Sequence, residues 1–127
     1  MANAKQHAII GAAVAGGLCL LVEITRASAS PDNRPLWQRI DYGKVAAFAV
    51  VGAALGLLPD LLEPATSPNH RRFFHSPTTI GCVISGVVGK HTERWPPDTQ
   101  QDASIMAAAF LSHLAIDAIT PKGLPLI

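Results

Sequence analysis

Charged residues are scarce in this sequence, and the few present nearly balance. They make up 15% of the 127 residues and give a formal net charge of +1, so the chain lacks the basic surface that nucleic-acid binding requires. Cysteine is equally scarce. The two present, Cys19 and Cys82, form no CxxC pair, which argues against a zinc ribbon, a redox pair or a disulfide framework. Both lie in apolar stretches and are expected to be buried free thiols.

Strand patterns, internal repeats and low-complexity linkers are missing as well. No stretch of useful length alternates apolar and polar residues, so no sheet is expected. What remains is apolar, with a hydrophobic share of 49% and a mean hydropathy of +0.28. A chain of 127 residues is expected to form a single domain, residues 1–127, with one core.

Four apolar segments separated by polar connections predict four helices. Helix-start signals precede them: Asn3 with Gln6, Asp41, Ser76 before Pro77, and Asp98 with Gln101. Pro59 is expected to end or kink the second helix, and Pro121 to stop the fourth. The sequence therefore predicts an all-α, up-down four-helix bundle with helices at about residues 4–25, 41–58, 77–89 and 98–120.

The helices are expected to be embedded in a membrane. Their apolar runs, residues 8–22, 45–58, 78–89 and 103–116, are shorter than the roughly 20 residues of a spanning helix, so flanking residues must be recruited. They are apolar around most of their circumference, which leaves apolar outer faces on so small a bundle. The first run resembles a signal peptide, but residues 23–26 form a poor cleavage site, and a retained helix is expected.

His113 and Asp117 are the most informative pair of polar residues. They are four positions apart near the end of an apolar helix, so both side chains lie on one face. Placing them there costs several kcal/mol unless they are paired or bound to an ion. An imidazole and a carboxylate on one face could hold a divalent metal ion. The alternative is a helix-end pair in which the two residues hydrogen bond to each other.

Alternating helix directions would bring further polar residues to the same end of the bundle. In an up-down bundle the first and third helices begin at this end, and the second and fourth finish there. Two imidazoles and two carboxylates suit Zn²⁺, with Mn²⁺ and Fe²⁺ as alternatives, and such a site can activate a water molecule. The residues expected there are His7, Asp60, Glu63, His70, His75, His113 and Asp117.

Each of these residues also has a plainer interpretation. Asp60 could cap a turn, His75 could be an ordinary helix-start residue, and His7 could be exposed in a first turn. Glu63 could be a ligand, a general base or a solvated loop residue. His70 could be a ligand, orient one, or contact a phosphate. The neighbouring Arg71 and Arg72 could hold a phosphate or face solvent or lipid headgroups.

Three ordered motifs resemble the YdjM-type family, whose members are described as membrane-bound metal-dependent hydrolases. They are residues 57–60 (LLPD), 70–76 (HRRFFHS) and 112–126 (SHLAIDAITPKGLPL). The family pattern reads roughly LPDxDH, HRGxTHS and SHLxxDxxTPxGxPL, with an N-terminal histidine that His7 matches. The resemblance spans nearly the whole chain and implies a location in the bacterial inner membrane.

The family is distantly similar to zinc-dependent phospholipases C and related single-strand nucleases. That likeness implies that one ion is held by four side chains and that His7 approaches a second ion, with Asp117 bridging. The four implied ligands are Asp60, His75, His113 and Asp117. Leu62 and Glu63 depart from the family pattern, which has aspartate and histidine there. Because many members continue well past Ile127, one ion is expected here rather than two or three.

Two functions follow as expectations. The first is a membrane-associated metal-dependent hydrolase that acts on a phosphoester, or on the headgroup of a membrane lipid, with Glu63 or His70 handling the proton. The second is a non-catalytic membrane or assembly protein whose metal site is structural or degenerate, which the departures at Leu62 and Glu63 favour.

Overall fold

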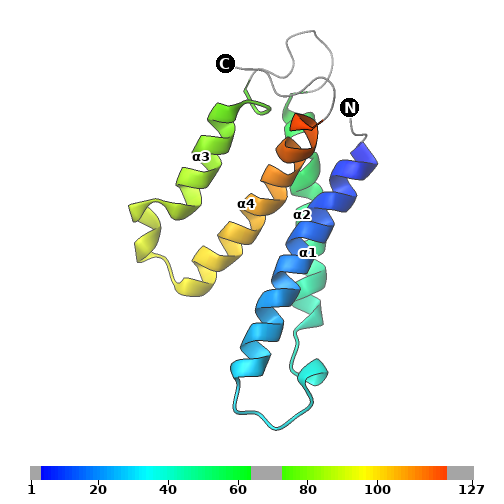
Figure 1. Cartoon of the computed structure of the whole chain (residues 1–127), viewed down its shortest axis with the longest axis vertical. Helices are drawn as coiled ribbons and strands as arrows, with labels where there is room; N and C mark the ends of the chain where they lie inside the picture. Colours follow the sequence, from blue (N-terminus) through cyan, green and yellow to red (C-terminus); the bar gives the residue numbers. More distant parts are fainter. Residues whose placement is uncertain (1–3, 64–72, 120–127) are drawn as a thin grey trace.

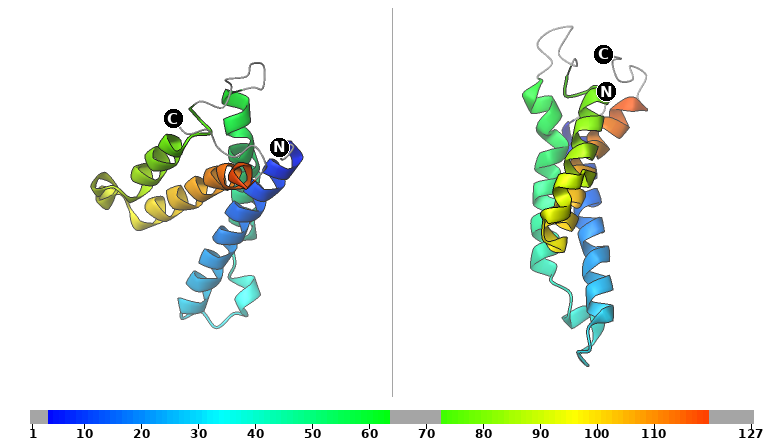
Figure 2. Two further views of the ribbon diagram at one scale, coloured as in Figure 1. Left: turned by 45° about the horizontal axis from the view of Figure 1, so that its top comes forward. Right: turned by 90° about the vertical axis from the view of Figure 1, so that its left-hand side faces the viewer.

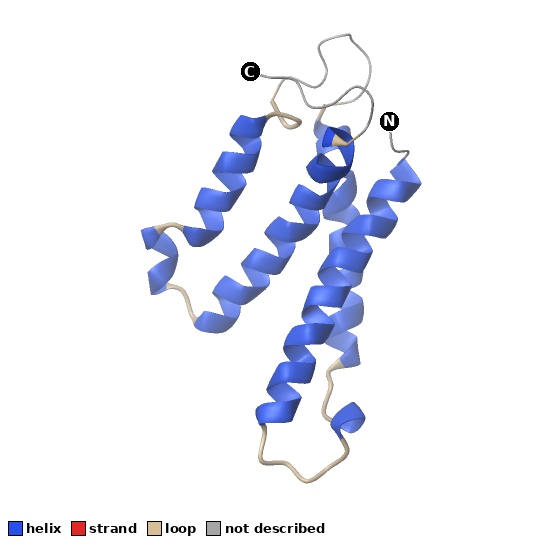
Figure 3. Ribbon diagram, viewed as in Figure 1, coloured by secondary structure: helices blue, strands red, loops and turns tan. Residues whose placement is uncertain are grey.

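The computed structural model describes residues 4–63 and 73–119. Within these ranges the chain is all helical, with no strand (Figure 3), which confirms the predicted all-α class. The helices are α1 (Ala4–Ala29), α2 (Tyr42–Leu62), α3 (Pro77–Val88) and α4 (Pro97–Ala118), with short 3-10 helices η1 (Leu36–Gln38) and η2 (Lys90–Arg94). The predicted signals at Asn3 and Pro121 lie outside the described residues.

Two of the predicted helix starts are confirmed. The Asp41 side chain accepts a hydrogen bond from the Lys44 backbone N–H at 2.9 Å and caps α2. The Ser76 side chain accepts from the Thr79 N–H at the start of α3, where Pro77 takes the first helical position.

The predicted cap at Asp98 is wrong. Helix α4 begins one residue earlier, at Pro97, with Pro96 at the cap position. The Asp98 carboxylate instead binds the guanidinium of Arg26 on α1, so a tertiary ion pair takes the place of the local cap.

Pro59 lies inside α2 and does not end it. The helix continues to Leu62, and the Glu63 N–H donates to the Pro59 carbonyl at 3.0 Å to close the last turn. The extra turn matters because it carries Asp60 as a helical residue and brings Glu63 to the helix terminus.

Helices α1 and α2 form the most extensive contact, α4 packs on both, and α3 packs on α4. Figures 1 and 2 show the α3–α4 hairpin standing beside the α1–α2 pair. The core is therefore built by α1, α2 and α4, and α3 lies to one side of it. The buried cluster of the core consists of Ala15, Cys19, Phe48, Ile105 and Ala109.

The two cysteines differ in burial because of this helix arrangement. Cys19 is buried in the core as expected, but Cys82 is exposed, so the expectation for Cys82 is wrong. Among the described helices, α3 packs mainly on α4, and Cys82 lies on a face of α3 that this contact does not cover.

Glycines bring α1 and α2 close together. A Cβ added to Gly11 would clash with the Gly52 carbonyl, and one added to Gly56 would clash with the carbonyl of His7. Only glycine allows this approach, which is typical of helices that associate in membranes. The close contact at Gly56 lies directly beside the polar residues described below.

Charged side chains tie α1, α2 and α4 at the opposite end. Glu23 on α1 is 7% exposed, and its carboxylate accepts from the Asp41 N–H at 3.4 Å. Lys44 lies 3.9 Å from Glu23 and 3.4 Å from Asp102 of α4.

Helices α1 and α2 are each long and apolar enough to cross a membrane. Only 28% and 22% of the residues in their most apolar windows are buried inside the protein, so most of this surface is free to face lipid. The 12 residues of α3 would span only about 18 Å, less than the roughly 30 Å hydrocarbon layer.

Candidate metal centre

The alternating helix directions bring polar residues from all four helices to one end of the protein. His7 lies in the first turns of α1, Asp60 in the last turn of α2, and His75 just before α3. His113 and Asp117 lie in the last turns of α4. The structure thus brings these five predicted residues together. They belong to the end of the bundle at which α1 begins and α4 ends, which is the upper end in Figure 1.

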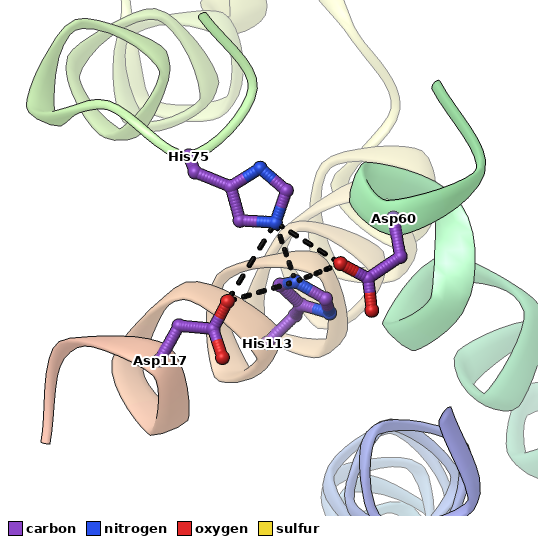
Figure 4. Close-up of side chains that lie close together, drawn as sticks. All are labelled: Asp60, His75, His113 and Asp117. Carbon is purple, nitrogen blue, oxygen red and sulfur yellow. Dashed lines mark hydrogen bonds and ion pairs between the residues drawn. The ribbon is translucent and has the colours of Figure 1, made fainter. Parts of the chain in front are cut away.

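Four of these side chains converge on one point (Figure 4). One ligand atom from each of Asp60, His75, His113 and Asp117 lies within 4.8 Å of the others. The His75 Nε2 atom is 3.1 Å from His113 Nε2 and 3.2 Å from Asp60 Oδ1. Asp117 Oδ2 is 3.6 Å from both Nε2 atoms, and Asp60 Oδ1 is 3.6 Å from His113 Nε2.

These distances fit a tetrahedral metal site. Four ligand atoms at 2.0–2.1 Å from a central Zn²⁺ would be about 3.3–3.4 Å from one another. Five of the six separations, from 3.1 to 3.6 Å, bracket that value, and the sixth, between Asp60 and Asp117, is at most 4.8 Å. The four residues therefore suit a divalent ion in both chemistry and spacing.

The ring of His113 is oriented by the backbone of α2. Its Nδ1 atom is 2.7 Å from the carbonyl oxygen of Gly56. A carbonyl can only accept, so Nδ1 carries the hydrogen and donates it. In the neutral ring the Nε2 atom is then left with a lone pair that faces the cluster.

The ring of His75 is oriented by a carboxylate. Its Nδ1 atom is 3.1 Å from Glu63 Oε2. The same carboxylate accepts the backbone N–H groups of Phe73 at 2.8 Å and of Phe74 at 2.9 Å. Neutral His75 is thus also held with its Nε2 lone pair toward the cluster, and a carboxylate behind a ligating histidine is common in metal sites.

The two Nε2 atoms therefore meet in a way that needs a cation. At 3.1 Å apart, two bare imidazole nitrogens repel each other, and two carboxylate oxygens add negative charge beside them. Either a proton on one ring or a metal ion among the four atoms would remove this conflict. Metal binding satisfies all four ligand atoms, whereas one proton satisfies at most a pair.

The titration of Glu63 agrees with this geometry. Burial raises the pKa of the Glu63 carboxyl, but hydrogen bonds from Phe73, His75 and Phe74 outweigh it and hold the pKa below its ordinary value.

His7 lies on the far side of Asp117. Its ring stacks on that of His113 with centroids 3.8 Å apart, and its Nε2 atom is 3.5 Å from Asp117 Oδ1. The side chain is 1% exposed, and neither ring nitrogen is hydrogen-bonded within residues 4–63 and 73–119. Asp117 thus directs one oxygen toward the cluster and the other toward His7.

Asp60 forms the open side of the cluster. Its side chain is 32% exposed, whereas those of His75, His113 and Asp117 are fully buried. His70, Arg71 and Arg72, predicted at this end of the bundle, lie outside the described residues.

Sequence reasoning missed the groups that orient the histidines. The Gly56 carbonyl is a backbone atom three-quarters of the way along α2, and no residue pattern distinguishes it. The backbone N–H groups of Phe73 and Phe74 cannot be recognised from the sequence either, because every residue except proline has one. Glu63 was a candidate, but for a ligand or a base, and the contact with His75 Nδ1 appears only in the folded chain.

The comparisons with known proteins agree with the membrane character of the helices. The family described as YdjM inner membrane protein matches the chain over residues 1–127. Neither the curated proteins nor the solved structures gave a match. With the whole length matched and two helices able to cross a membrane, the chain belongs to the YdjM family of inner membrane proteins.

Proposed function

We propose that this membrane protein is a metal-dependent hydrolase that acts on a phosphoester. One observation carries the proposal: two histidines, each fixed by a partner at Nδ1, direct their Nε2 atoms at each other 3.1 Å apart. The carboxylates of Asp60 and Asp117 complete a set of four ligands.

The ion would be held by Asp60, His75, His113 and Asp117. Zn²⁺ suits two nitrogens and two oxygens at tetrahedral spacing, with Mn²⁺ and Fe²⁺ as alternatives. Such an ion lowers the pKa of a bound water toward neutrality and so supplies a nucleophile. His7, whose Nε2 atom lies 3.5 Å from Asp117 Oδ1, would stand behind this ligand, and one ion per protein is proposed.

A lipid headgroup is the phosphoester that the surroundings favour. Leu61 and Phe73, next to the segments that carry Asp60 and His75, are 70% and 53% exposed. Apolar side chains beside the open edge of a metal site suit an amphiphilic substrate held in the bilayer. Arg71, Arg72 and His70 remain predicted phosphate or proton-transfer groups from the sequence.

A non-catalytic metal clamp is the second candidate. Three of the four ligand side chains are fully buried, as is common for closed structural sites. The ligands also come from α2, the start of α3 and α4, so an ion would tie three segments together.

Metal analysis and a hydrolysis assay distinguish the candidates. The purified protein in detergent should retain about one equivalent of Zn²⁺ and hydrolyse a chromogenic nitrophenyl phosphodiester, and His113→Ala should lose both properties. His91→Ala is the matched control, because His91 is exposed and belongs to η2 at the other end of α3. Metal retention without turnover on soluble or lipid phosphodiesters would favour the clamp, and a protein that binds no metal would exclude both.

A further inference from the structure

Glu63 occupies an unusual position at the end of α2. It is the C-terminal cap residue of the helix, and its side chain is 14% exposed. Both carboxylate oxygens are engaged: Oε1 accepts the Phe73 N–H, and Oε2 accepts the Phe74 N–H and lies 3.1 Å from His75 Nδ1. One side chain therefore receives three donors from three consecutive residues.

These contacts fix two aspects of His75 at once. The bonds to the Phe73 and Phe74 amides set the path of the backbone that leads into α3, and the Ser76 cap continues it. The bond to Nδ1 sets the ring orientation and the tautomer. Within residues 4–63 and 73–119, Glu63 is the group that holds Nδ1, and the contacts of Nε2 are with the cluster atoms.

We propose that Glu63 is a positioning residue, which holds His75 with its Nε2 atom directed at the metal ion and does not itself exchange protons with the substrate. This inference rests on the proposed metal site. It assigns Glu63 a role through His75, as a carboxylate that orients a metal ligand.

The placement of Glu63 argues against a proton-transfer role. It contacts Nδ1, whereas an ion and any water on it would lie at Nε2, on the other side of the ring. A general base must come within hydrogen-bonding reach of the proton it takes, directly or through one water. Glu63 has the imidazole of His75 between itself and the cluster, and its oxygens already accept three hydrogen bonds.

The other histidine shows why Glu63 is the informative residue to change. His113 is oriented by the carbonyl of Gly56, a backbone group that no substitution removes. His75 depends on a side chain, so its orientation can be tested without touching a metal ligand.

The test compares Glu63→Gln with Glu23→Gln in the full-length protein in detergent. Glutamine keeps the shape but replaces one acceptor oxygen with an NH₂ group, which opposes the backbone N–H groups. We expect Zn²⁺ affinity to fall 10–100-fold in Glu63→Gln and to stay unchanged in Glu23→Gln. Glu23 is a fair control because it is also buried and also accepts a backbone N–H, at the opposite end of the bundle.

A spectroscopic readout separates positioning from general destabilisation. At saturating Co²⁺ the wild type and Glu23→Gln should give the same intense visible absorption of a tetrahedral site, and Glu63→Gln a weaker or shifted band. Should Glu63→Gln fail to fold, Glu63→Asp is the second variant. It retains the negative charge but has a side chain one methylene shorter, so a smaller loss of Zn²⁺ affinity is expected.

The outcomes separate this inference from the proposed function. A wild-type protein that binds metal, together with a Glu63→Gln variant of equal affinity and identical Co²⁺ spectrum, would overturn the positioning role and leave the metal site intact. A wild-type protein that binds neither Zn²⁺ nor Co²⁺ would overturn the metal site itself, and the positioning role with it.

Discussion

The Nε2 atoms of His75 and His113 lie 3.1 Å apart, although the two residues are 38 positions apart in the sequence. Each ring is held from behind, one by a carboxylate of α2 and the other by a backbone carbonyl of α2. Helix α2 and its C-terminal cap residue Glu63 therefore contribute the candidate ligand Asp60 and both orienting groups, and α2 is the element around which the candidate centre is built.

Metal addition should stabilise the folded protein. A ligand that binds only the native state at 100 times its Kd adds about 2.7 kcal/mol to the free energy of unfolding. We expect a Zn²⁺-dependent rise in the unfolding midpoint in detergent, which His113→Ala abolishes and His91→Ala preserves. Equal shifts in all three proteins would mean that Zn²⁺ acts elsewhere.

Much of this centre could be predicted from the sequence because it depends on helix direction. Apolar segments with start signals locate four helices, and alternation then places His7, Asp60, His75, His113 and Asp117 at one end. That prediction needs no knowledge of packing angles. The cluster distances agree with it.

What failed in the prediction depended on tertiary contacts. Asp98 follows the local capping pattern but pairs with Arg26 of another helix. Cys82 lies in an apolar segment yet is exposed, because α3 packs on α4. The sequence predicts that Pro59 ends or kinks α2, and the end is wrong because α2 continues to Leu62. Local patterns cannot foresee which neighbour a side chain will meet.

Gly56 should tolerate no larger residue. A Cβ there would clash with the His7 carbonyl, so Gly56→Ala must separate α1 from α2 and shift the carbonyl that accepts from His113. We expect a loss of about 1–3 kcal/mol in the free energy of unfolding together with weaker Zn²⁺ binding.

Gly86→Ala is the matched control for this substitution. Gly86 is also helical, but a Cβ there meets nothing within 4 Å. Alanine should be neutral or stabilise the protein by about 0.5–1 kcal/mol, with no change in Zn²⁺ affinity. If both variants behaved alike, the close α1–α2 contact would not matter to the centre.

The contribution of Glu63 to stability should depend on pH. Its pKa is lowered in the folded protein from an ordinary value of 4.5, so its stabilising effect is present above that value and is lost as the pH falls through the folded-state pKa. In metal-free protein the difference in unfolding midpoint between wild type and Glu63→Gln should be largest near pH 7 and shrink below pH 4.5. A difference independent of pH would contradict an ionised Glu63.

Metal removal should loosen α3 before the rest of the protein. Helix α3 packs on α4 alone among the more extensive contacts, and its N-terminal end is tied to α2 through His75, Asp60 and Glu63. An ion would strengthen that tie, because it would bond His75 to ligands on α2 and α4 together.

Chelation should therefore raise amide hydrogen exchange in residues 73–88. Residues 11–19 of α1, which pack against the glycines of α2, should exchange as before. A uniform rise across both segments would show that the ion supports the whole bundle, and no change in either would show that α3 is held by α4 alone.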